Sequence, residues 1–208
     1  MGSRTRAPPA LGKLLDIDEA FTDKFCKYSQ RISLMRWLKN RSKSLEVSCH
    51  GIPWFAGLML LIVITSSPSL HQLQVNLLFG LLLDVILVAV IKAYVRRRRP
   101  AKNRGDMFAT FSIDNFSFPS GHASRAAFLT YFFTFLCPLP SYIILFVLVW
   151  ANSVCLSRIL LNRHYVMDVL AGVALGYAEG YILNILWLSE GLSCWLISWL
   201  SDTIFDEE

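Results

Sequence analysis

The sequence predicts an all-α, multi-span membrane helix bundle with an N-terminal amphipathic helix, and three observations support this fold class. The 208-residue chain is 54% hydrophobic and only 17% charged, which is too apolar for an ordinary soluble domain. Several apolar runs approach the roughly 20 residues that a helix needs to cross hydrocarbon. Before the first run, apolar residues recur at three- and four-residue steps, the period of a helix with one apolar face.

The first 44 residues are expected to stay outside the hydrocarbon. Residues 1–13 are expected to form a flexible tail without a cleavable signal peptide. Residues 14–44 are too charged to span, and we expect them to form an amphipathic helix on the cytoplasmic headgroups; packing on the rest of the domain explains the pattern equally well. The apolar stripe consists of Ile17, Phe21, Phe25, Tyr28, Ile32 and Met35.

Five apolar runs are the predicted spans, and a sixth, shorter run follows them. The five runs are residues 52–67, 75–95, 123–137, 141–161 and 166–188. The short ones suit the endoplasmic reticulum membrane, whose hydrocarbon is about 27 Å thick. Residues 190–208 contain the sixth run, 192–205, which we expect to form an interfacial or short helix before an acidic tail.

Basic residues are distributed unevenly between the two sides of the predicted bundle. The formal net charge is +5, and no Lys or Arg occurs in residues 66–74, in residues 138–140 or after Asp168. The basic residues instead lie mainly before the first predicted span, after the second, and between the fourth and fifth. By the positive-inside rule, these three segments are expected to be cytoplasmic.

The stretch richest in chemical groups lies between the last two predicted spans. His164 and Asp168 are four residues apart, so the carboxylate can accept the Nδ1 proton of the imidazole if a helix begins near His164. The other ring nitrogen then keeps its lone pair, as a nucleophile or general base requires. Arg158 adds a planar guanidinium that matches two phosphate oxygens. A polar loop at headgroup level, without catalysis, is the alternative interpretation.

Two further stretches add groups that suit an anionic ligand. Lys92 and Arg99 belong to a basic cluster at the end of the second predicted span, which the helix macrodipole and anionic lipid also explain. Ser120 is a good helix N-cap, and Gly121 lets a ligand approach the N–H groups of a helix start. His122 stands at the same end, where a proton donor is needed; a plain turn is the alternative.

Ionisable and small residues inside the predicted spans indicate packing. Asp84 is expected to face the bundle interior, in the direction of Asn152, although a functional role is equally compatible with its position. Glu179 has no assigned role. A small-residue face for close helix packing is predicted at Gly172, Gly176 and Gly180.

Together, the three polar stretches resemble the signature of the type 2 phosphatidic acid phosphatase superfamily. The matching patterns are Lys92-x6-Arg99-Pro100, Pro119-Ser120-Gly121-His122 and Ser157-Arg158-x5-His164-x3-Asp168. More narrowly, residues 45–54 and 96–101 resemble the polyisoprenoid diphosphate/phosphate phosphohydrolases, also called presqualene diphosphate phosphatases. The resemblance covers about residues 45–189, which it implies to be a membrane phosphatase domain.

The resemblance implies a role for each matching residue. His164 would attack phosphorus and form a phosphohistidine, Asp168 would orient it, and His122 would protonate the leaving oxygen and then activate water. Phosphate oxygens would be held by Lys92, Arg99, Ser120, Gly121 and Arg158. No metal or other cofactor is expected. Two roles are open for Arg96, Arg97 and Arg98: neutralising a second phosphate, or contacting lipid headgroups only.

The expected function is therefore metal-independent hydrolysis of isoprenoid diphosphates or monophosphates at the cytoplasmic face of the endoplasmic reticulum or nuclear envelope. The alternatives are a general lipid phosphate phosphatase, acting on phosphatidate, lysophosphatidate or sphingoid-base phosphates, and a non-catalytic membrane scaffold. Expected partners are a lipid substrate and the membrane, without nucleic acid, and the oligomeric state is not predicted. The five cysteines lack metal-ligand spacing, and the sequence contains no His-Glu-x-x-His, Walker loop or Cys-x5-Arg motif.

Overall fold

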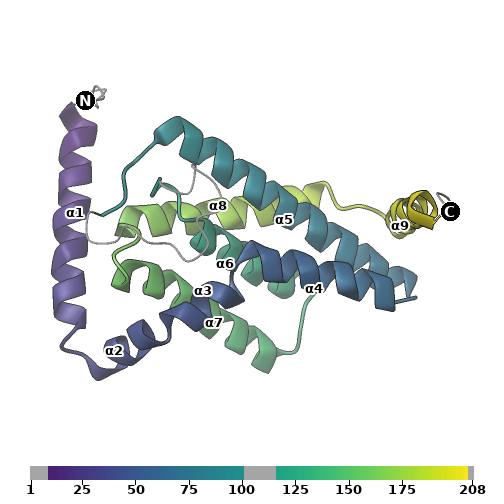
Figure 1. The fold of residues 1–208 in the computed structure, drawn as a ribbon, viewed down its shortest axis with the longest axis horizontal. Coiled ribbons are helices and arrows are strands. Elements are labelled where there is room, and N and C mark those ends of the chain that lie inside the picture. Colours follow the sequence, from purple (N-terminus) through teal and green to yellow (C-terminus); the bar gives the residue numbers. More distant parts are fainter. Residues whose placement is uncertain (1–8, 101–115, 206–208) are drawn as a thin grey trace.

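The computed structural model describes residues 9–100 and 116–205, and within these ranges the chain is almost entirely helical (Figure 1). The described residues contain no strand beyond an isolated antiparallel bridge between Arg98 and Phe116. The predicted all-α fold class is confirmed. The helices are α1 (Pro9–Ser29), α2 (Ser33–Asn40), α3 (Ser42–Ser48), α4 (Gly51–Ile64), α5 (Pro68–Val95), α6 (Gly121–Tyr131) with the π-helical continuation η2 (Phe132–Leu136), α7 (Ser141–Leu160), α8 (Val166–Ile185) and α9 (Glu190–Phe205).

The helices α5, α7 and α8 are long and apolar enough to cross a membrane, and α3 with α4, which meet at a 43° bend, give a fourth span if they are counted together. The predicted span 123–137 is not among these candidates in the described part of the chain. It forms only the 11 residues of α6 and the five of η2. Residues 123–130 are all buried, because α6 lies inside the bundle in contact with α5, α7 and α8.

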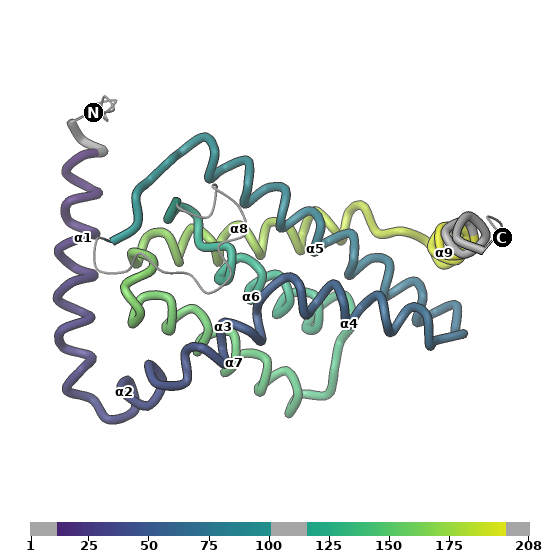
Figure 2. The backbone as a smooth tube through the Cα atoms, in the orientation of Figure 1, coloured from purple at the N-terminus to yellow at the C-terminus, as the bar shows by residue number. Residues whose placement is uncertain are grey.

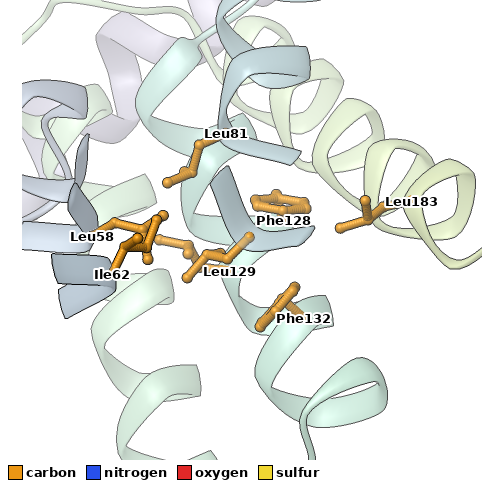
Figure 3. Packing of buried hydrophobic residues seen from close by; sticks show 8 residues of the cluster. Leu58, Ile62, Leu81, Phe128, Leu129, Phe132 and Leu183 are labelled. Carbon is orange, nitrogen blue, oxygen red and sulfur yellow. The ribbon is translucent and has the colours of Figure 1, made fainter. Parts of the chain in front are cut away.

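The close contact of α6 with α8 depends on the predicted small-residue face. A Cβ atom at Gly172 would lie 2.5 Å from the Ser120 carbonyl oxygen, and one at Gly176 would overlap the Ser124 carbonyl oxygen. The backbones of the two helices therefore approach more closely than any larger residue allows. Farther along α8, Leu183 packs with α4, α5 and α6 in an apolar cluster (Figure 3). The labelled members are Leu58, Ile62, Leu81, Phe128, Leu129, Phe132 and Leu183.

A buried charged cluster lies between α5, α6 and α8. Arg125 donates to Asp84 at 2.7 Å and to the Cys49 carbonyl at 3.1 Å, and Ser124 donates to Glu179 at 3.3 Å. Asp84 therefore faces the interior, as predicted, but its partner is Arg125. The predicted direction toward Asn152 is wrong, because the exposed Asn152 amide donates to the Leu148 carbonyl of its own helix.

The amino-terminal segment differs from its prediction in extent and in packing. The expected single helix over residues 14–44 is three helices, and α1 begins at Pro9, inside the expected tail, of which residues 1–8 lie outside the described part. The apolar residues Ile17, Phe21 and Tyr28 are 65%, 56% and 63% exposed. The buried face of α1 is instead formed by Asp18, Thr22, Cys26 and Ser29.

Two helices cross opposite ends of the bundle. α1 lies across the end at which α5 and α7 finish and α8 begins, and α9 lies at the other end (Figures 1 and 2). α9 has 16 residues and is not among the candidate spans of the described chain. This agrees with the expected short helix, while its interfacial location stays a prediction.

Candidate active site

The three polar stretches meet at the end of the bundle that α1 covers, where the chain leaving α5 runs toward α1 (Figure 2). Ser117 joins the first two stretches, because its N–H donates to the Arg97 carbonyl at 2.8 Å. The Ser117 carbonyl also accepts a hydrogen bond from His164 at 2.7 Å. The Ser120 N–H donates to the Asp168 carbonyl at 3.0 Å. Backbone hydrogen bonds thus hold the three stretches together.

His164 is buried, with 4% of its surface exposed, in the turn between α7 and α8. Because a carbonyl can only accept a hydrogen bond, the contact with Ser117 places the proton on Nδ1. The Nε2 atom then keeps a free lone pair, which is what a nucleophile requires. Ser117 was not predicted as a site residue, since a main-chain carbonyl has no signature in the side-chain pattern.

The predicted hydrogen bond from His164 to Asp168 is not formed. The His164 Nδ1 to Asp168 Oδ2 distance is 3.9 Å, which allows charge attraction but no hydrogen bond. The reason is that α8 begins at Val166, after His164, so the two residues do not share a helix face. Asp168 instead accepts from the Tyr165 N–H at 2.9 Å and from Arg97 at 2.6 Å.

Cations surround the His164 imidazole. Burial lowers the pKa of His164 well below its ordinary value of 6.5, and the positive charges of Arg99, Lys92 and Arg158 lower it further. The imidazole is therefore neutral at physiological pH. The same cations create a strongly positive site that suits a phosphate.

Ser120 and His122 add polar atoms at the start of α6. Ser120 is the N-cap residue, as predicted, but its hydroxyl makes no capping hydrogen bond. Ser120 Oγ and His122 Nε2 are buried and have no hydrogen-bond partner within residues 9–100 and 116–205. Gly121, the first residue of α6, lies between them. Buried polar atoms of this kind are costly unless a ligand or water completes them.

Two residues of α3 contact the Arg158 guanidinium, and the sequence pattern did not indicate these contacts. Arg158 is 1% exposed, and its guanidinium lies 3.7 Å from the Glu46 carboxylate and 3.5 Å from the Ser42 carbonyl. Glu46 also pairs with Arg163. The available signal was weak, because Glu46 is a lone acidic residue in the stretch 45–54.

Arg97 has contacts in the site that the sequence pattern did not predict. It pairs with Asp168 at 2.6 Å and with Asp18 of α1 at 2.7 Å. The idea that Arg97 neutralises a second phosphate is therefore wrong, because its guanidinium is already engaged by two carboxylates. The Nε atom of Arg96 donates to the Ala93 carbonyl.

The described residues contain no group of three or more His, Cys, Asp and Glu side chains placed to hold a metal ion. Hydrolysis without a metal stays a prediction. The converging residues are instead two imidazoles, a hydroxyl, a helix N-terminus and several cations, a set that can bind and transfer a phosphoryl group.

Comparison with known proteins identifies the family. The chain is 41% identical over 138 residues to the probable lipid phosphate phosphatase beta of Arabidopsis thaliana, covering 54% of this chain and 65% of that protein. It is 35% identical over 108 residues to phosphatidylglycerophosphatase B of Bacillus subtilis (strain 168), covering 48% of this chain and 50% of that protein. The chain thus spans between half and two thirds of the length of these two relatives.

Two solved structures share the fold. The transmembrane PAP2-type phosphatidylglycerolphosphate phosphatase from Bacillus subtilis has a TM-score of 0.58 at 24% identity, covering 84% of this chain and 86% of that one. Aquifex aeolicus LpxE has a TM-score of 0.56 at 21% identity, covering 71% of this chain and 85% of that one. Residues 73–190, which contain all three polar stretches, match the PAP2 superfamily. The chain therefore belongs to the PAP2 superfamily, the type 2 phosphatidic acid phosphatases whose signature its three stretches resemble.

Proposed function

We propose that this protein is a lipid phosphate phosphatase that transfers the phosphoryl group of a membrane lipid to His164 and then to water. The observation that carries the proposal is the buried, neutral His164 imidazole among the cations of Arg99, Lys92 and Arg158. The relatives named as lipid phosphate phosphatase and phosphatidylglycerophosphatase support the substrate class.

We assign the residues to two successive chemical steps. In the first, His164 Nε2 attacks phosphorus, the P–O bond to the lipid breaks, and His122 passes a proton to the leaving oxygen. Burial and the charges of Arg158 and Arg125 lower the pKa of His122 well below 6.5, so this proton comes from the bound phosphate monoanion. In the second, His122 takes a proton from water, which attacks the phosphohistidine and releases inorganic phosphate. Asp168, 3.9 Å from Nδ1, stabilises the positive charge that His164 gains in the first step.

The phosphate oxygens are assigned to groups that do not move a proton. Lys92, Arg99 and Arg158 balance the charge that spreads over these oxygens in the transition state. Ser120 Oγ and the N–H of Gly121 supply hydrogen bonds from the start of α6. Because these charges are fixed in the protein, the proposed reaction proceeds without a metal ion.

An apolar groove favours an isoprenoid substrate. The groove has a volume of about 410 Å³ and is lined by side chains of α4, α5 and η2, among them Trp54, Leu58 and Phe132. This volume is in the range of about 300–1,000 Å³ that is usual for ligand sites. Ser48 lies at the groove and precedes Cys49, whose thiol is 3.3 Å from the His122 carbonyl. A groove with this apolar lining suits a prenyl chain.

Phosphate release by purified protein in detergent with EDTA tests the proposal, with farnesyl diphosphate, presqualene diphosphate and phosphatidate as substrates. Release that disappears in His164→Ala supports a metal-free lipid phosphatase, and a preference for the prenyl substrates supports the isoprenoid class. Preference for phosphatidate would instead favour a general lipid phosphate phosphatase, which the relatives' names also suggest. Absence of release from folded protein would contradict the enzyme and favour a membrane scaffold.

Gly57→Leu tests the groove itself. A Cβ atom at Gly57 meets nothing within 4 Å, so the longer side chain can occupy the groove without distorting α4. We expect kcat/KM for farnesyl diphosphate to fall about tenfold or more, as for loss of a few kcal/mol of apolar contact, while a five-carbon prenyl diphosphate is hydrolysed as before. Gly191→Leu in α9 is the matched control, since its Cβ is equally unobstructed. An equal fall in kcat/KM for both substrates would mean that the prenyl chain of the substrate binds outside this groove.

A further inference from the structure

Arg97 lies between two carboxylates that come from distant parts of the chain. Its Nη1 contacts Asp168 at 2.6 Å and its Nη2 contacts Asp18 at 2.7 Å. The side chains of Asp168 and Asp18 are 0% and 3% exposed, so both negative charges depend on this guanidinium. The Arg97 guanidinium also lies 4.1 Å from the centre of the Tyr165 ring, which fixes its plane.

The same face of α1 supplies hydrogen-bond acceptors for the first N–H groups of α8. The first N–H groups of a helix have no partner within the helix. Here the Val166 N–H donates to Thr22 at 3.2 Å, and the Met167 N–H donates to Asp18 at 3.1 Å. Asp18 thus uses one oxygen for Arg97 and the other for the α8 backbone. Docking of α1 therefore contributes to where α8 begins.

The start of α8 determines the geometry of the site. His164 lies two residues before its first residue, Val166, and Asp168 lies in its first turn. The Asp168 carbonyl accepts from the Ser120 N–H at 3.0 Å, so a shift of α8 also moves the N-cap of α6. The Arg97 backbone is tied in as well, because its carbonyl accepts from the N–H of Ser117, the residue that fixes His164.

We propose, building on the function proposed above, that Arg97 is a positioning residue for the reaction and that α1, through Asp18, is part of the active-site framework. Arg97 neutralises Asp168, leaves its second oxygen for the Tyr165 N–H, and couples both to α1. Arg97 and Asp18 do not touch the substrate. Their loss should change the rate of phosphoryl transfer more than substrate binding, because Lys92, Arg99 and Arg158 still bind the phosphate.

Steady-state kinetics of Arg97→Gln and Asp18→Ala test the proposal. We expect kcat to fall about tenfold or more, since a displacement near 1 Å can cost about a hundredfold, with KM changed much less. Asp16→Ala is the matched control, because Asp16 is an exposed aspartate on the same helix, and it should behave as the unmodified protein does. The double variant Asp18→Ala/Arg97→Gln should be little worse than Arg97→Gln alone, because both changes break one framework.

Hydrogen exchange of the Val166 and Met167 amides separates this proposal from the proposed function. Both variants should exchange these amides faster than Asp16→Ala does. Unchanged kcat in an active protein, or a fall in kcat without faster exchange, would overturn the proposal. If the unmodified protein hydrolyses no lipid phosphate, the proposed function fails, and the exchange rates still decide: faster exchange supports the framework and unchanged exchange overturns it.

Discussion

At the scale of single residues, the chemistry depends on the protonation of His164. Burial and the neighbouring cations Arg99 and Lys92 keep the pKa of His164 well below 6.5. Ser117 fixes the remaining proton on Nδ1. The nucleophilic form is thus the resting form at physiological pH, and no proton has to leave His164 before it attacks.

The acid limb of the pH profile should report this pKa. Protonated His164 cannot attack, so kcat/KM should fall only well below pH 6.5. Lys92→Gln removes a cation and should move the limb to higher pH, while lowering kcat/KM by about a hundredfold if Lys92 also stabilises transition-state charge. Lys39→Gln on the exposed face of α2 is the control. A limb that stays in place would show that Lys92 does not act on His164.

Folding stability should follow the same titration. Below about pH 6.5 the imidazole of the unfolded chain binds a proton, whereas the folded state resists it because the pKa of His164 is lowered. The unfolded state then carries more protons, so stability falls as the pH falls through this range and is fully present above it.

The site shows what side-chain patterns can and cannot indicate. The spacing of the signature residues predicted which groups would converge, and the structure brings His164, His122 and the cations together. The pattern wrongly paired His164 with Asp168, because it assumed that one helix carries both. The contacts of Ser117, Glu46 and Asp18 could not be predicted, since each joins segments far apart in the sequence.

At the scale of helices, the backbones of α6 and α8 approach each other closely at the glycines of α8. Gly176→Ala places a Cβ against the Ser124 carbonyl and should lower stability by about 1–3 kcal/mol, as overpacking usually does. Gly191→Ala, with open space around its Cβ, should have little effect. Thermal unfolding in detergent measures the difference. Equal melting temperatures for the two variants would mean that α6 and α8 can move apart at Gly176 without loss of stability.

Helix positions were predicted well where apolar runs are continuous. The predicted spans 141–161 and 166–188 correspond to α7 and α8 within a few residues. α5 begins seven residues before its predicted start, where a polar residue has a partner that a hydropathy pattern does not show: Gln72 donates to the Leu188 carbonyl. α1 presents its polar face to the bundle for the same reason, since Asp18 and Thr22 cap α8.

At the scale of the whole molecule, the pair of Arg125 and Asp84 joins α5 to α6 inside the bundle. Arg125→Met leaves the buried carboxylate of Asp84 without its cation and should cost about 3–5 kcal/mol. Arg125→Met/Asp84→Leu should recover part of this loss, because no unpaired charge remains at this pair. The melting temperatures of the variants provide the comparison. A double variant less stable than Arg125→Met would indicate that the pair itself stabilises the bundle.

The orientation in the membrane is a separate prediction for the whole molecule. α1 and α2, which carry basic residues of the amino-terminal segment, lie at one end of the bundle, and α9 lies at the other (Figure 1). We expect the first end to face the cytoplasm, in the endoplasmic reticulum or nuclear envelope. A glycosylation acceptor inserted in residues 66–74 should then be modified, and one in residues 101–114 should not. The opposite pattern would reverse the orientation.

Trapping of the covalent intermediate tests the central claim most directly. His122 is assigned both to protonation of the leaving oxygen and to the release of phosphate, so the test needs a substrate whose leaving group requires no added proton. With farnesyl diphosphate, whose leaving group is itself a phosphate, His122→Ala in EDTA should accumulate an acid-labile phosphoryl group on His164. Rapid quenching followed by peptide mass spectrometry would locate it, with His122→Ala/His164→Ala as the blank. A phosphoryl group on residue 164 that is absent from the blank is the predicted result. Hydrolysis by the unmodified protein without any such intermediate, or a phosphoryl group on another residue, would contradict the mechanism.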